Sequence, residues 1–410
     1  MIKSPKNKTN HSKRSEIFKL LTILGFAPIC GSAFAVDFIG NIVKPPAGSW
    51  VSPNFPKHYG ARVWTPTGNV KDNQLIYENI QFPPPSQSLG RHELYGGFTP
   101  RGEATGNVVR FTHCASCGNY IYDIYGAYIG GGNAEENSVK VKFIGGPNGQ
   151  SAVHGGWSAG GNTNRNRVDV SDSQGLERVE GAHIVSGGNA EENEVRIANT
   201  TIEKTVSGAF VEYSKKAHTV RGNKVQLLDS TINVRGYGKI TGGESNGLYA
   251  TVSANEVYVR DSNIYNVSGG RARTGTVIDN KVILENVVVR PGHTLNPTYI
   301  AGGELYQIGT VKDNSVEIRG DSDVNGYVAG GYSLGGTPDI RNNTVILNGR
   351  ITVTESVYGG VMVTHVLTPV NDRPNKLSLT GLIKAGNIDG FSDLDLNVSA
   401  VNELTAANSE

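Results

Sequence analysis

Acidic residues that lie close together in the sequence are the first candidates for chemistry. They form three pairs: Asp169 with Asp172, Asp321 with Asp323, and Asp393 with Asp395. Two neighbouring carboxylates can serve as the acid and the base, or the nucleophile, of glycoside hydrolysis. The first two pairs lie in or beside a turn between strands, where Asp is favoured because its side chain hydrogen-bonds the nearby backbone. The sequence therefore favours a structural role for these aspartates.

A serine and the histidines are the next candidates. Gly320-Asp321-Ser322 resembles a serine-protease nucleophile motif, but Asp323 occupies the position of the expected glycine. Asp229-Ser230 and Asp261-Ser262 hold the same place in other repeats, which indicates a turn. A catalytic triad is defined by geometry, and no spacing among the scattered histidines suggests one: His58, His92, His154, His183, His218, His293 and His365. We expect no catalytic residue, no metal ligand and no cofactor.

Cys114 and Cys117 form a CxxC motif in FTHCASCGNY. A redox pair would need a helix start in a thioredoxin-like context, whereas this motif falls in a turn of a repeat. Zinc would need two further ligands, and only His113 is adjacent. In an exported protein the favoured interpretation is a local disulfide, since that compartment is oxidising. The closed loop is so short that the bond should stabilise the fold little.

A repeat determines the elements that must position these residues. An Asn-x-apolar-x-apolar core recurs at spacings of 25 to 34 residues, with weaker versions at Asn73 and Asn107. The core asparagines are Asn137, Asn166, Asn193, Asn223, Asn255, Asn280, Asn314 and Asn343. A period of about 20–50 residues is typical of solenoids, propellers and arrays. One asparagine per unit also predicts a hydrogen-bonded asparagine ladder inside the turn.

The period inside the unit decides between these folds. The second and fourth residues after each asparagine are apolar, as in Val139 and Val141, and the alternation indicates a strand with one buried face. An aromatic-x-small-Gly-Gly segment such as Tyr327–Gly331 marks a bend on the opposite side of the unit. Propeller blades are longer, about 40–50 residues. We therefore predict an all-β, right-handed parallel β-helix of about 9–10 coils.

The residue directly after each asparagine predicts how the coils stack. In successive units this position is occupied by Ser138, Arg167, Glu194, Lys224, Glu256, Lys281, Ser315 and Thr344. Five consecutive members alternate in sign, from Arg167 to Lys281. Neighbouring strands lie about 4.8 Å apart, so opposite charges would meet in this charge column. Chance alternation on a solvated face is the alternative.

Residues 1–35 have the pattern of a secretory signal peptide. A basic start precedes the apolar run Leu20–Ile29, and Ala33-Phe34-Ala35 forms a small-x-small cleavage site. Cleavage is expected between Ala35 and Val36, with lipidation at Cys30 as the weaker alternative. The apolar run is too short for a stable membrane anchor. Removal leaves a formal net charge of −4 without a basic stripe, so no nucleic-acid partner is expected.

The remaining chain divides into three parts. Residues 36–90 are rich in proline and read as an N-terminal cap with a first irregular coil, 91–365 as the repeat domain, and 366–410 as a coil remnant and tail. Aromatic residues precede the glycine pairs at Tyr128, Trp157, Tyr299 and Tyr327. If they face outward they could contact sugars, and if they face inward they belong to the core.

Several repeats resemble those of bacterial autotransporter (type V secretion) passenger domains, namely GGYSLGGTPDIRNNTVIL, GGNAEENEVRI and YGGFTPRGEATGNVVRF. The tail LTGLIKAGNIDGFSDLDLNV is similar to the segment that often closes such repeats. The resemblance covers roughly 90–400 and implies Sec export and display by a C-terminal barrel in the outer membrane. This chain departs from the pattern, because too few residues follow the last coil for about eight strands of about ten residues. The translocator barrel is therefore expected to be missing from this chain.

The resemblance implies a cell-surface, outer-membrane-associated or secreted protein, or a periplasmic one if no translocator is available. We expect a monomeric, non-enzymatic binding module of adhesin type, whose partner is a host-surface glycan or protein. One alternative is a β-helix polysaccharide lyase or glycoside hydrolase, which a carboxylate cluster in a groove beside Arg or Lys would favour. A truncated remnant without independent function is the other.

Overall fold

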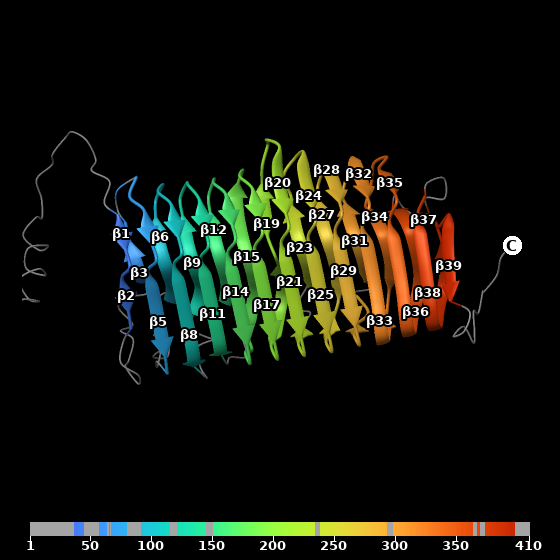
Figure 1. Ribbon diagram of the computed structural model, residues 1–410, viewed down its shortest axis with the longest axis horizontal. Coiled ribbons are helices and arrows are strands. Elements are labelled where there is room, and N and C mark those ends of the chain that lie inside the picture. The colour runs from blue at the N-terminus through green and yellow to red at the C-terminus, as the bar shows by residue number, and fades with distance from the viewer. Residues whose placement is uncertain are drawn as a thin grey trace, which may run out of the picture. The chain divides into compact units, whose positions relative to one another are not determined.

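The structure is a computed structural model that describes residues 37–44, 57–63, 65, 67–79, 92–114, 121–144, 151–233, 238–292, 298–363, 367–369 and 374–397. These residues form a parallel β-solenoid of about 10 turns and contain no helix (Figure 1). Accordingly, no helix in this part of the chain is long and apolar enough to cross a bilayer. Residues 1–35 and the expected cleavage between Ala35 and Val36 lie outside the described residues.

Each coil begins with a short strand that leads into the asparagine turn. Within the described residues these strands form an 11-stranded sheet. They are β1 (Phe38–Ile39), β4 (Val70–Lys71), β7 (Ala104–Thr105), β10 (Ala134–Glu135), β13 (Thr163–Asn164), β16 (Ala190–Glu191), β20 (His218–Arg221), β24 (Ala250–Ser253), β28 (Gly275–Ile278), β32 (Gly309–Lys312) and β35 (Asp339–Arg341).

A second strand follows each asparagine, and in the last coil β39 follows Ser392 instead. These strands are β2 (Ile42–Val43), β5 (Gln74–Glu78), β8 (Val108–Cys114), β11 (Ser138–Ile144), β14 (Arg167–Ser171), β17 (Glu194–Ala198), β21 (Lys224–Leu228), β25 (Glu256–Arg260), β29 (Lys281–Glu285), β33 (Ser315–Val324), β36 (Thr344–Val363), β38 (Lys376–Asp389) and β39 (Asp393–Asn397). Short strands follow the next turn in three coils: β22 (Thr231–Ile232), β26 (Asn263–Ile264) and β30 (Val288–Val289).

The third strand of each coil carries a Gly-Gly or Gly-Ala pair, which we call the glycine pair. In one coil this pair, Gly208-Ala209, lies between two strands, and in the coil of β36 it lies within β36 itself. These strands are β3 (Lys57–Arg62), β6 (His92–Thr99), β9 (Ile121–Ile129), β12 (Ser151–Ser158), β15 (Leu176–Ser186), β18 (Thr201–Ser207) with β19 (Phe210–Tyr213), β23 (Lys239–Ser245), β27 (Asn266–Ala272), β31 (Tyr299–Leu305) and β34 (Tyr327–Ser333). The second and third strands belong to one 28-stranded sheet. In Figure 1 the coils follow one another in sequence order from blue β1 to red β39.

The strands of successive coils pair in parallel, and this pairing excludes a propeller. The one antiparallel partner among the described strands is β37 (Leu367–Pro369), which pairs with β36. The segment predicted as the cap contains β1 to β5, and these strands pair in register with the coils that follow, as Tyr59 does with Tyr95. Regular stacking therefore begins before the repeat domain that the sequence delimits at 91.

The interior is a continuous apolar core built from the alternating positions of the second and third strands. Val168 and Val170 are at most 2% exposed, and they pack in one cluster with Val195 and Ile197 of the next coil. Each fully buried aliphatic side chain of this kind stabilises the fold by about 1.5–3 kcal/mol. Polar residues on the same strands consequently point to the outer surface, where any functional site must lie.

The asparagine turn has the same backbone in successive coils. In ten successive coils the residue before the asparagine has a positive φ of 52–67°, and this left-handed conformation produces a sharp turn. These residues are Asp72, Gly106, Glu136, Arg165, Glu192, Gly222, Ala254, Asp279, Asp313 and Asn342. Most carry a side chain in a conformation that costs free energy, so the asparagine hydrogen bonds must compensate for it.

Candidate functional site

The glycine pair bends the third strand so that two side chains face each other on its outer side. Tyr95 and Phe98 flank Gly96 and Gly97 in β6, and residues three apart on a flat strand would point to opposite faces. Their rings nevertheless lie 5.7 Å apart. A Cβ on Gly96 or Gly97 would come within 3.3 or 2.8 Å of the interior residue Asn107. Both glycines therefore face the interior, and the flanking side chains meet outside.

The same two positions in successive coils form two columns, which together we call the outer corner. The pre-glycine column consists of Tyr59, Tyr95, Tyr125, His154, Glu180, Ser207, Thr241, Ser268, Ala301, Ala329 and Tyr358. The post-glycine column consists of Arg62, Phe98, Tyr128, Trp157, His183, Phe210, Glu244, Arg271, Glu304, Tyr332 and Val361.

The first coils of the outer corner are aromatic. In the post-glycine column, Phe98 stacks on Tyr128 at 5.5 Å between ring centroids, and Tyr128 stacks on Trp157 at 4.1 Å. In the pre-glycine column, Tyr95 stacks on Tyr125 at 5.1 Å. Tyr125 and Tyr128 meet edge to face across the corner at 5.2 Å. Such pairs add about 0.5–1.5 kcal/mol beyond their buried area, so the aromatic corner is rigid.

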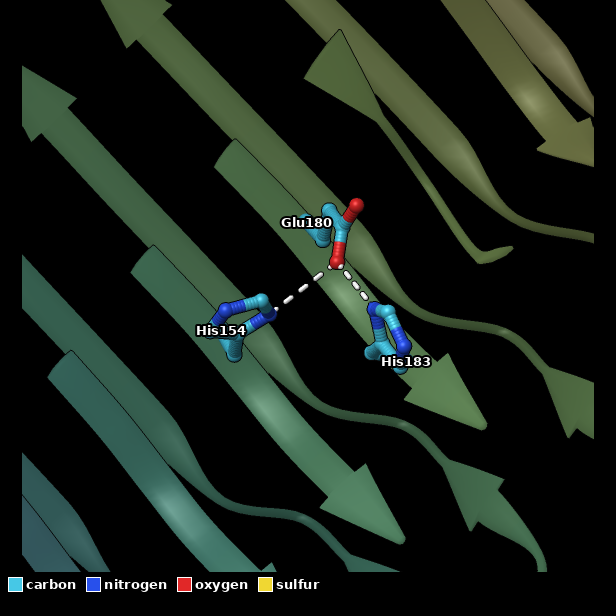
Figure 2. A group of neighbouring side chains, drawn as sticks. All are labelled: His154, Glu180 and His183. Atoms are coloured by element: carbon cyan, nitrogen blue, oxygen red, sulfur yellow. Dashed lines mark hydrogen bonds and ion pairs between the residues drawn. The ribbon is translucent and has the colours of Figure 1, made fainter. Parts of the chain in front are cut away.

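A buried cluster of two histidines and a glutamate follows the aromatic coils. Register places His154 of β12 beside Glu180 of β15, and His183 lies three residues further along β15. Nδ1 of His154 is 3.0 Å and Nδ1 of His183 is 2.7 Å from the same oxygen, Oε2 of Glu180. Figure 2 shows the two rings approaching this oxygen from neighbouring strands. The three residues are 4%, 3% and 6% exposed, in the order His154, Glu180 and His183.

Two further charged residues contact the cluster from its edges. Nε of Arg178 lies 3.7 Å from Oε1 of Glu180, and Nε2 of His183 lies 3.4 Å from Oε2 of Glu212. A pocket of about 200 Å³ adjoins both histidines and is also lined by Asp123, Tyr125, Trp157 and Arg178. The cluster is therefore buried, but it lies directly beside an opening in the outer corner.

The charges of the cluster shift the pKa values of its members. Burial alone would raise the pKa of the Glu180 carboxyl, but the positive charges of His183 and His154 and the hydrogen bond with His183 outweigh burial and lower it well below its usual range. Burial would lower the pKa of His183, and Glu180 and Glu212 together raise it instead. The arrangement therefore stabilises a carboxylate and a cation side by side.

The later coils of the outer corner carry a second charged cluster. Glu244 forms an ion pair with Lys239, and its Oε1 is 3.3 Å from Nη1 of Arg271. Nε of Arg271 is 3.2 Å from Oε1 of Glu304, which also accepts a hydrogen bond from the Tyr299 hydroxyl at 2.9 Å. Each buried carboxylate thus has at least one cation partner. This mutual pairing indicates a structural network, in which Oε2 of Glu304 is the one carboxylate oxygen without a hydrogen-bond partner among the described residues of the cluster.

The predicted asparagine ladder runs beside the interior face of the glycine pairs. Nδ2 of each asparagine donates to Oδ1 of the asparagine in the next coil at 2.8–3.3 Å. Besides the eight predicted members and the two weaker ones, the ladder includes Asn41 at its start and Asn375 at its end. The ladder is structural, because its amides are buried from Asn73 onward and already paired.

The predicted charge column is present in the strand register. Arg167 pairs with Glu194, Glu194 with Lys224, Lys224 with Glu256, and Glu256 with Lys281. Nη1 of Arg167 and Oε2 of Glu194 lie 3.6 Å apart. Other ion pairs of these residues run along the strand instead, as between Arg167 and Asp169 at 2.8 Å. The column lies on the surface, where Lys224 is exposed and the other four members are half-buried.

The acidic pairs and Ser322, which the sequence also singled out, lie at turns or on exposed strands away from the outer corner. Asp172 has a positive φ in a turn, and Asp393 and Asp395 lie in the exposed strand β39. Ser322 accepts a hydrogen bond from the backbone of Val287 at 3.1 Å, as a turn residue does. Cys117 and the Cys114 side chain lie outside the described residues, so the disulfide stays a prediction. The four singled-out aromatic residues are half-buried on the outer side of their strands: Tyr128, Trp157, Tyr299 and Tyr327.

The His154, Glu180 and His183 cluster is what the sequence interpretation missed. The histidines have no regular spacing in the sequence. Glu180 is not a member of the three aspartate pairs that the sequence singled out. Alignment on the glycine pair would have found the cluster. His154 directly precedes Gly155-Gly156, and Glu180 directly precedes Gly181-Ala182, so the two residues occupy the same position in neighbouring coils. Comparison of the chain with protein-family models, curated proteins and solved structures finds no match.

Proposed function

We propose that this chain is an exported, non-enzymatic binding module of adhesin type, and that it holds an extended glycan along the aromatic part of the outer corner. The observation that carries the proposal is the outward, half-buried column of Phe98, Tyr128 and Trp157, stacked at 5.5 and 4.1 Å. Export and surface or extracellular location rest on the signal-peptide pattern of residues 1–35.

The glycan is favoured by the mixture of groups along the corner. Charged groups lie beside the aromatic rings. The carboxylates of Asp123 and Glu177 and the guanidinium of Arg178 all line the pocket beside Trp157. Glycan sites combine flat apolar contacts with a few fixed hydrogen-bonding groups. One ring per coil repeats at about 4.8 Å, close to the length of one sugar unit. Because the ring faces are stacked on each other, a sugar would contact ring edges and the Trp157 indole N–H.

Binding of the purified chain to an array of linear polysaccharides tests the proposal. Trp157→Ala is expected to weaken capture by at least tenfold, since a central aromatic contact in an interface is commonly worth about 2 kcal/mol. Tyr213→Ala is the matched control, because Tyr213 is 48% exposed and lies outside both columns. Equal binding by both variants, or no binding to any polysaccharide, would contradict the proposal.

A second candidate function, cleavage of a glycan, is favoured by one observation. The pocket brings the carboxylate of Asp123 beside Arg178, and Glu180 lies immediately behind it. Carboxylates next to a cation in a corner are the arrangement expected of a β-helix lyase or hydrolase. Release of new reducing ends from a bound polysaccharide, abolished in Asp123→Asn, would replace the binding proposal with this one.

A further inference from the structure

Three donor atoms converge in the buried cluster of the outer corner. One donor atom from each of His154, Glu180 and His183 lies within 4.8 Å of the other two, and Figure 2 shows both imidazoles beside one oxygen of Glu180. A tetrahedral zinc site with metal–ligand distances of about 2.0–2.2 Å holds its donors roughly 3.3–3.5 Å apart. Small side-chain rotations would convert the present distances of 3.0 and 2.7 Å into that geometry.

His154 supplies an independent indication of a ligand. Its Nδ1 is buried and has no hydrogen-bond partner, although Glu180 Oε2 is only 3.0 Å away, because the direction is wrong for a hydrogen bond. A buried nitrogen without a partner is costly and rare in native proteins. A cation between the nitrogen and the carboxylate would satisfy both.

The surroundings of His183 have the form of a metal-binding histidine. Its two ring nitrogens each approach a carboxylate, Nδ1 at Glu180 and Nε2 at Glu212. A neutral imidazole donates from only one nitrogen, so either the ring carries both protons or a cation takes the place of the Nδ1 proton. Metal-bound histidines commonly donate their other N–H to a carboxylate, which is the position of Glu212.

The donor set and the pocket define the kind of ion. Two imidazole nitrogens and one carboxylate oxygen suit Zn²⁺ and related divalent transition metals rather than Ca²⁺ or Mg²⁺. Arg178 lies 3.7 Å from Oε1 of Glu180, which leaves Oε2 for the ion. The pocket beside both histidines provides room for water or a ligand at a fourth position. We propose that His154, Glu180 and His183 bind one divalent transition-metal ion of the Zn²⁺ class.

Metal titration of the full chain without a polyhistidine tag tests this inference. The protein is treated with chelator, desalted, and titrated with ZnCl₂ by calorimetry and with CoCl₂ by visible absorption. One equivalent of Zn²⁺ per chain is expected, together with Co²⁺ absorption bands of a nitrogen–oxygen site. Zn²⁺ should also raise the Tm, since an ion that binds only the folded state stabilises it. The metal site does not depend on the proposed glycan binding, because metal titration is done without any glycan.

Variants separate a built site from adventitious binding. His154→Gln and Glu180→Gln should abolish the stoichiometric Zn²⁺ isotherm, and Glu212→Gln should weaken it by about 10–100-fold. Glu212 is a surface residue outside the cluster, so Glu212→Gln should fold. This variant therefore still tests the site if a ligand variant does not fold. His218→Gln is the control, because His218 is equally buried but hydrogen-bonded to Ser245 at 2.6 Å. The inference is overturned if wild type binds less than one equivalent, or if the His154 and His218 variants bind alike.

Discussion

Asn166 and Asn193 come from neighbouring coils and share one oxygen. Both the backbone N–H and Nδ2 of Asn166 donate to Oδ1 of Asn193, at 3.0 and 2.9 Å. Nδ2 of Asn166 also donates to the carbonyl oxygen of Ala134 at 2.9 Å. A side chain at this position needs an acceptor and two donors at the same short reach, and asparagine provides both. This requirement explains why the repeat is anchored on asparagine.

Replacement of a central ladder residue should therefore destabilise the solenoid strongly. In Asn193→Ala, Asn166 loses its acceptor, and the carbonyl of Thr163 and Oδ1 of Asn223 lose a donor. The free energy of unfolding should fall by at least about 3 kcal/mol, because each buried group left unpaired costs about 1–3 kcal/mol. Urea unfolding followed by circular dichroism measures it. Asn348→Ala, at an exposed position of β36, should stay within about 0.5 kcal/mol of wild type.

The left-handed turn position allows a reciprocal pair of substitutions. Gly222 and Ala254 occupy the same position in neighbouring coils, with φ of 65° and 52°. A Cβ on Gly222 would meet no atom closer than 3.5 Å, so only the backbone conformation opposes it. Gly222→Ala should lower the free energy of unfolding by about 1 kcal/mol. Ala254→Gly should raise it by up to about the same amount, and part of this gain is lost because glycine makes the unfolded chain more flexible. If both substitutions change the Tm in the same direction, then the positive φ does not determine how this position affects stability.

The charge column predicts a small, salt-dependent effect. Glu194 lies between Arg167 and Lys224 in register, and Glu194→Lys would place three cations in successive coils. The free energy of unfolding should fall by about 1 kcal/mol at low ionic strength, and by less in high salt because exposed charges are screened. Glu194→Gln removes the attraction without adding repulsion, so its loss should be smaller. If the two variants are equally stable at low salt, the alternation of charges does not contribute to register.

Glu244 gives the solenoid a defined acid sensitivity. Burial would raise the pKa of this carboxyl, but Lys239 and Arg271 outweigh burial and lower it from its ordinary value of 4.5. The unfolded chain therefore binds a proton that the folded chain does not, so this stabilisation is present above about pH 4.5 and is lost as pH falls through the folded pKa. Urea unfolding across this range measures the loss.

A variant isolates the contribution of Glu244. Glu244→Gln leaves Lys239 and Arg271 without their shared carboxylate and should lower the free energy of unfolding by about 3–5 kcal/mol at neutral pH. The difference from wild type should shrink as pH falls below about 4.5, and it should be smallest below the folded pKa, where the wild-type carboxyl is also neutral. Asp321→Asn, which replaces an exposed carboxylate, is the control, and its free energy of unfolding should change with pH in parallel with that of wild type. A constant difference at every pH would mean that Glu244 does not titrate in this range.

The sequence predicted the fold because each feature recurs in every coil. Two features predict parallel stacking, namely the alternation at Val139 and Val141 and the spacing of the asparagines. Because both recur in each unit, an irregular unit does not change the prediction. The candidate site could not be found in this way because it occurs once. Its members come from two coils, and their contact depends on a bend at the glycine pair that turns residues three apart toward each other, as at Glu180 and His183. Strand alternation alone places such residues on opposite faces.

The side-chain chemistry changes along the post-glycine column, so different regions of the solenoid respond to different conditions. Up to Phe210 the corner is held mainly by rings, and from Glu244 to Glu304 by alternating charges. Coils in such a stack are coupled only to their neighbours, so unfolding advances as a front from coil to coil. Acid weakens the coils from Glu244 to Glu304, and it also weakens the coil of Glu180, whose carboxylate is held by His154 and His183. The stacked rings of Phe98, Tyr128 and Trp157 carry no charge, so the contacts between these rings do not depend on pH. Unfolding in acid should therefore begin in the charged coils, while the coils of the stacked rings keep their shape.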